Sequence, residues 1–133
     1  MRWFLFLLIF GIQIALTLPR FLDTCESKTT YTWSLYFFHH LFDVFLFWSF
    51  LFLTTKVEFG LHLAILIGVV IHWFTYDNKC IITVLMNREC GYPENQWLDS
   101  LKNMLGLRNV NEYFHFIWMF LVGFQDLYML QLI

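Results

Sequence analysis

Long apolar runs separated by short polar segments dominate this chain, and this pattern predicts helices that cross a membrane. The four runs cover residues 3–18, 31–53, 57–76 and 113–133. Each is close to the roughly 20 residues that a helix needs to cross the hydrocarbon core of a bilayer. Charged residues are rare within the runs, so lipid is the expected solvent for most of the surface. We therefore predict an all-α integral membrane bundle of about four transmembrane helices.

The polar residues between the runs predict where the helices end. Pro19 and Arg20 follow the first run, and a proline is expected to stop a helix because it removes a backbone donor. Arg2 precedes this run, as in a signal peptide, but no small-residue cleavage site follows it, so we expect the helix to be retained. The 133 residues suffice for one compact domain and are too few for a second.

The segment of residues 77–112 is too long to be a simple connector between packed helices. Residues 80–86 form an apolar run that is too short to span a bilayer, so we expect it to lie at the membrane interface. After Pro93, helical spacing predicts an amphipathic helix in the headgroup plane. Its apolar face would consist of Trp97, Leu98, Leu101, Met104 and Leu105. Asn109 and Glu112 resemble a capping box for the last helix.

Basic residues favour one orientation in the membrane. Four spans place both termini on one side and the connections of residues 19–30 and 77–112 on the other. These connections hold most of the cations, namely Arg20, Lys28, Lys79, Arg88, Lys102 and Arg108, whereas the terminal side holds Arg2 and Lys56. Cytoplasmic segments carry an excess of Lys and Arg, so this count favours the long connections in the cytoplasm.

Ionisable residues within the spans are the strongest lead to function, because such groups are costly in lipid. Aligning the antiparallel spans by depth predicts two polar layers. One layer contains His39, His40, Asp43, His72 and His115, and the other contains His62 and Asp126. Imidazoles on facing helices can bind zinc, copper or haem iron, or transfer protons. They can equally form interhelical hydrogen bonds that fix helix register. We favour the second interpretation and predict no cofactor.

A stripe of small residues marks a predicted helix-packing face. Gly60, Ala64 and Gly68 recur at every fourth position of the third span. Small residues at this spacing allow two helix backbones to approach closely in a membrane. The partner could be another span of this chain or another subunit.

The three cysteines, Cys25, Cys80 and Cys90, map to the side of the long connections. In an oxidising compartment, Cys80 could pair with Cys90, or Cys25 with either, which leaves one thiol. In the cytoplasm all three would be reduced. No C-x-x-C motif is present, so we expect a structural role rather than thiol–disulfide exchange.

Charge and motifs narrow the class of function. A net charge of −2 argues against binding to nucleic-acid phosphates. The chain lacks G-x-S-x-G, P-loop, G-x-G-x-x-G and H-E-x-x-H motifs, which favours a protein that is not an enzyme.

One short pattern carries a resemblance. His72-Trp73 is followed by Asn78-Lys79-Cys80 with Thr83, and then by Cys90-Gly91-Tyr92. This pattern resembles uncharacterised small multi-spanning membrane proteins of large DNA viruses of algae and protists. The resemblance implies a component of a virion internal membrane or of a virus-modified host membrane, where such proteins anchor the capsid.

The leading hypothesis is therefore a non-catalytic integral membrane scaffold protein. Its expected partners are the lipid bilayer and other protein subunits of a larger assembly. Two alternatives stay open: a membrane-embedded metal- or haem-binding redox protein that uses the histidines, and an accessory subunit of a mitochondrial membrane complex.

Overall fold

All regular elements are helical in the computed structural model, which describes residues 1–76, 79–92 and 114–133. The elements are α1 (Trp3–Thr24), α2 (Thr30–Trp48), the short 3₁₀ helix η1 (Ser49–Leu51), α3 (Lys56–Thr75), α4 (Ile81–Cys90) and α6 (Phe114–Leu130). This confirms the predicted all-α class. Three helical segments are long and apolar enough to cross a membrane: α1, α2 with η1, and α3. Helix α6 is also apolar but shorter, at 17 residues.

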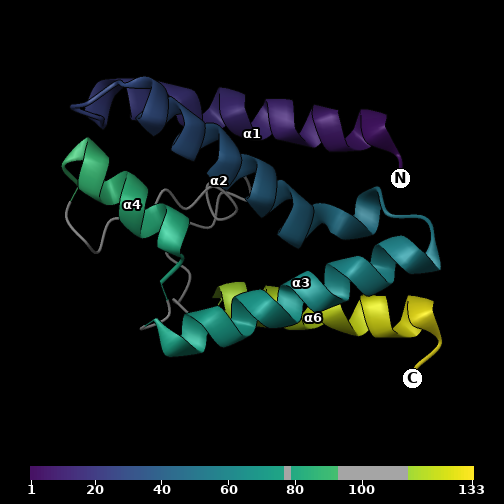
Figure 1. The fold of residues 1–133 in the computed structure, drawn as a ribbon. Coiled ribbons are helices and arrows are strands. Elements are labelled where there is room, and N and C mark those ends of the chain that lie inside the picture. The colour runs from purple at the N-terminus through teal and green to yellow at the C-terminus, as the bar shows by residue number, and fades with distance from the viewer. Residues whose placement is uncertain (77–78, 93–113) are drawn as a thin grey trace.

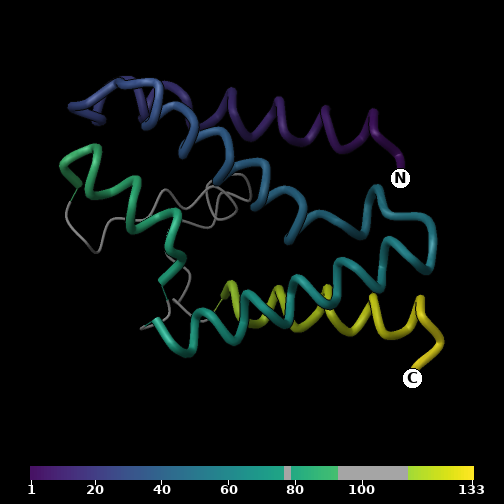
Figure 2. The backbone as a smooth tube through the Cα atoms, in the orientation of Figure 1, coloured from purple at the N-terminus to yellow at the C-terminus, as the bar shows by residue number. Residues whose placement is uncertain are grey.

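Two antiparallel helix pairs make up the bundle (Figure 1). Helix α1 packs against α2, and α3 packs against α6. Figure 2 shows that α2 lies near α3 at their shared turn and diverges from it towards the other end, where α4 packs against α2. Both chain termini lie at the end of the bundle that holds the α2–α3 turn, which we call the terminal end (Figure 1). The opposite end, with the α1–α2 connection and α4, is the loop end.

The prediction that Pro19 stops the first helix was wrong, because α1 continues through it to Thr24. A proline inside a helix costs about 3 kcal/mol, and tertiary packing must offset this cost. The residues beyond Pro19 supply such packing. Phe21 is fully buried and stacks on the ring of Tyr36 at a centroid distance of 4.4 Å. Cys25, directly after the helix, is buried and bonded to Cys90.

A polar cap fixes the start of α3 at the terminal end. Thr55 and Glu58 form a capping box, in which each side chain accepts a hydrogen bond from the backbone N–H of the other residue. The Glu58 carboxylate also accepts from the amine of Met1 at 2.6 Å. These bonds hold the beginning of α1 beside the α2–α3 turn. The observed start of α3 differs from the predicted start by one residue.

Residues 80–86, predicted as an apolar interfacial run, lie largely within α4, which continues to Cys90. The helix ends at Gly91, whose φ of 70° is in the left-handed region that glycine adopts without strain. The predicted amphipathic helix with Trp97, Leu98, Leu101, Met104 and Leu105 lies outside the described residues. The predicted cap of Asn109 and Glu112 also lies outside them.

Candidate functional site

A buried network of five polar side chains joins α1 to α2. Gln13 and Thr17 come from α1, and Tyr36, His40 and Asp43 come from α2; each is less than a tenth exposed. The Thr17 hydroxyl lies 2.7 Å from the Tyr36 hydroxyl and 3.0 Å from His40 Nε2. Gln13 Nε2 lies 3.0 Å from His40 Nδ1 and 2.5 Å from Asp43 Oδ2. The network thus spans about two helical turns of the α1–α2 contact.

The donors and acceptors of this network fix the state of the His40 imidazole. The Thr17 hydroxyl donates to the Gln13 backbone carbonyl at 2.9 Å, so its oxygen accepts from His40 Nε2–H. The Gln13 amide nitrogen can only donate, so His40 Nδ1 accepts from it. An imidazole with one donating and one accepting nitrogen is neutral. Both ring nitrogens are therefore used within the bundle, and neither is available as a metal ligand unless these bonds break.

A second buried pair joins three helices. His62 on α3 and Asp126 on α6 are 0% and 1% exposed, with His62 Nδ1 2.6 Å from Asp126 Oδ2. His62 Nε2 lies 3.2 Å from the backbone carbonyl oxygen of Leu46 on α2. A carbonyl only accepts, so Nε2 carries a proton, and one further proton must lie between His62 and Asp126. The pair is therefore neutral overall, either as imidazolium and carboxylate or as imidazole and carboxylic acid. The predicted second layer is confirmed.

The predicted first layer does not come together as one cluster. His72 stacks on Tyr76 at a centroid distance of 4.9 Å, and its buried Nε2 has no hydrogen-bond partner in the part of the chain that the structure describes. His115 contacts the rings of Phe47 and Trp73. Helix α2 diverges from α3 and faces α1, so His40 and Asp43 pair with α1 instead of with His72. Across the described residues, no three His, Cys, Asp or Glu side chains form a group that could hold a metal ion.

Sequence reasoning missed the α1 half of the network. Gln13 and Thr17 are the polar side chains of the first apolar run and lie four residues apart, on one helix face. Polar residues at this spacing indicate a face that packs against protein instead of lipid. That signal could have identified α1 as the partner of His40.

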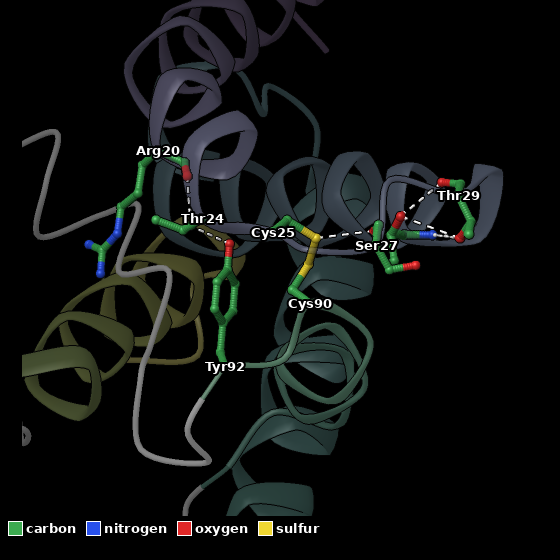
Figure 3. Close-up of a disulfide and its surroundings, with 8 residues drawn as sticks. Arg20, Thr24, Cys25, Ser27, Thr29, Cys90 and Tyr92 are labelled. Atoms are coloured by element: carbon green, nitrogen blue, oxygen red, sulfur yellow. Dashed lines mark hydrogen bonds between the residues drawn. A yellow bond between two sulfur atoms is a disulfide. The ribbon is translucent and has the colours of Figure 1, made fainter.

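A disulfide joins the loop end of α1 to the end of α4 (Figure 3). Cys25 and Cys90 form the bond, which is one of the pairings left open by the sequence, and Cys80 is the free thiol. Beside the bond, the hydroxyls of Thr24 and Tyr92 lie 2.5 Å apart (Figure 3). The disulfide and this hydrogen bond attach α4 to α1 on both sides of the α4 C-terminus.

Cys80 precedes α4 and contacts His39 of α2. Burial alone raises the pKa of the Cys80 thiol, but hydrogen bonds from His39 and from the backbone of Thr83 and Ile82 outweigh this effect and lower it. The contact places His39 in a Cys–His pair at the junction of α2 and α4, and its ring also lies 5.3 Å from the ring of the buried His40, measured between centroids.

The predicted stripe of small residues lies on the outward side of α3. Ala64 and Gly68 are exposed, and a Cβ added at Gly68 would meet no atom of the described residues within 4 Å. A Cβ at Gly60 would lie 3.9 Å from Leu130, an ordinary contact. The close approach between α3 and α6 occurs instead at Gly123, where a Cβ would lie 3.1 Å from Leu66. A packing role for the stripe therefore stays a prediction that concerns a partner outside the described residues.

None of the family models, curated proteins or solved structures compared with the chain matches it.

Proposed function

We propose that the chain is a multi-pass integral membrane protein with a structural, non-catalytic role, which anchors other protein subunits to a membrane. The observation that carries this proposal is that the buried histidines His40 and His62 form hydrogen bonds between helices. Both ring nitrogens of His40, and both of His62, form hydrogen bonds that join helices to one another. A cofactor or proton-transfer site would instead need a nitrogen that reaches a ligand or a path to solvent.

The outward surface supports a lipid environment. Large apolar side chains are exposed on several helices, for example Phe4 on α1, Phe74 on α3 and Phe120 on α6, each more than 70% exposed. Apolar surface of this extent marks a membrane or protein contact. Polar groups are buried between helices, and apolar groups face outward. A protein surrounded by lipid requires this arrangement.

Helix α4 is the described element best placed to bind a partner. Ile81, Val84 and Arg88 recur on one exposed face of the helix, while Met86 and Cys90 are fully buried on the other. Packing on α2 and the bond to Cys25 hold this face in a fixed orientation at the loop end. A preorganised surface binds a partner with less loss of conformational freedom.

The resemblance to membrane proteins of large DNA viruses suggests the setting for this role. On this proposal, the membrane is a virion internal membrane, and the partner is a capsid protein or another membrane subunit that contacts the loop end.

Acidic substitutions on the exposed face of α4 test the scaffold role. We expect Val84→Glu combined with Arg88→Glu to abolish cross-linking of the chain to its neighbours in the native membrane. The paired control, His72→Leu, should leave cross-linking intact with a stability change of no more than about 1.5 kcal/mol, because the His72 Nε2 forms no hydrogen bond with a described residue. Cross-linking mass spectrometry of both variants supplies the measurement, and circular dichroism checks their folding. Loss of cross-links in the histidine variant alone would contradict the scaffold role.

A further inference from the structure

An open groove of about 600 Å³ lies between helices α3 and α6 on the outer surface of the bundle. Aliphatic and aromatic side chains line it, prominently Ile67, Ile71 and Phe74 from α3, and Phe116, Phe120 and Phe124 from α6. Several of these side chains are more than half exposed. The lining offers almost no polar surface, so it suits a hydrocarbon guest and not a polar one.

The absence of a side chain at Gly123 contributes to this groove. Gly123 lines the groove together with Phe120 and Phe124 of the same helix. A Cβ there would already lie 3.1 Å from Leu66 across the helix contact. A larger residue at this position would therefore crowd the helix contact and occupy part of the groove.

The length and position of the groove match one leaflet of a bilayer. On α3 the lining extends from Leu63 to Phe74, which at 1.5 Å per residue is about 17 Å. Half of a hydrocarbon core of roughly 30 Å is about 15 Å. Phe74 lies one residue before the end of α3, and Leu63 lies near the middle of the helix. With α3 spanning the bilayer, the groove would extend from the membrane surface at the loop end to about the midplane.

We propose that this groove binds one acyl chain of a phospholipid from the leaflet at the loop end. The lipid would be retained during purification, unlike lipids that exchange freely around the protein. This inference rests on the membrane-embedded part of the proposed function and is independent of the scaffold role.

Two tryptophan substitutions on α3 form a matched test. Ile67→Trp places a large ring in the groove, whereas Leu61→Trp places the same ring on an outward part of the same helix that does not line the groove. Both positions are more than half exposed, so both variants should fold. Each variant is reconstituted in phosphatidylcholine, extracted in mild detergent and examined by native mass spectrometry.

We expect the wild type and Leu61→Trp to retain one phospholipid per chain. In Ile67→Trp, the fraction of chains that retain a phospholipid should be about tenfold lower. This corresponds to a loss of about 1.4 kcal/mol in the free energy of lipid binding. A second groove variant, Ile71→Trp, should behave like Ile67→Trp. Equal retention in all variants, or no retained lipid in the wild type, would overturn the proposal. A wild-type dimer that Ile67→Trp converts to monomer would also overturn it, because a second copy would then occupy the groove.

Discussion

Replacing Cys25 or Cys90 with serine should lower the free energy of unfolding by about 2–4 kcal/mol. The bond closes a loop across a sequence separation of 65 residues, so it removes a large amount of conformational freedom from the unfolded chain. Both sulfurs are buried, and Cys90 is fully inaccessible, so the loss of the bond also disturbs packing around Met86. The measurement is unfolding in mixed detergent micelles, followed by circular dichroism under oxidising conditions.

Cys80→Ser is the matched control for the disulfide. Cys80 is a free thiol at the other end of α4, so its replacement should change the free energy of unfolding by less than about 1 kcal/mol. A reducing agent should lower the stability of the wild type to that of Cys90→Ser and leave Cys90→Ser unchanged. Equal stability of the wild type with and without reductant would show that the bond does not stabilise the fold.

The disulfide also bears on orientation in the membrane. Disulfides persist in oxidising compartments, so the bond indicates that the loop end faces such a compartment. The count of Lys and Arg in the connections favours the cytoplasm for the same end. The disulfide and the charge count therefore favour opposite orientations. The charge count is the weaker indicator here, because it describes an average bias in membrane insertion. The disulfide, in contrast, requires oxidation at this particular site.

Replacing His62 with leucine should lower the free energy of unfolding by about 3 kcal/mol. Asp126 is almost fully buried, and without His62 its carboxyl group would lose its short hydrogen bond to the imidazole. A buried polar group that has lost its partner is costly, and the backbone carbonyl of Leu46 would lose its donor as well. The same detergent unfolding assay measures this effect.

The variant Asp126→Asn removes the ionisable carboxyl group of the pair but keeps a side chain that can hydrogen-bond to His62. The asparagine amide can donate to Nδ1 of a neutral His62, so this variant should lose less than about 1 kcal/mol. The double variant, His62→Leu with Asp126→Leu, should be more stable than His62→Leu alone, since no buried, unpaired carboxyl group remains. Additive losses in the double variant would contradict a direct interaction between the two side chains.

The span boundaries were largely predictable, because apolar runs bounded by polar residues define them. The start of α3 was predicted within one residue, and the pairing of His62 with Asp126 followed from the depth of each residue along antiparallel helices. Pro19 was misjudged because local propensity does not include the packing of Phe21 or the bond from Cys25 to Cys90. Tertiary contacts overrode the local preference there.

The partner of His40 could not be found by depth alone. Depth aligns residues on neighbouring helices but does not say which helices are neighbours. The alignment of α2 with α3 assumed contact along their whole length, whereas α2 diverges and packs on α1 and α4. The polar residues Gln13 and Thr17 on one face of α1 were a signal that could have identified the neighbour, because both contact His40.

The most direct test of the account is elemental analysis combined with an optical absorption spectrum of the purified chain in mild detergent. If the buried histidines join helices and hold no cofactor, the protein should contain no stoichiometric iron, copper or zinc and show no Soret band. Stoichiometric metal or a Soret band that His72→Leu removes would contradict the account, because His72 has a buried imidazole nitrogen that no described residue hydrogen-bonds.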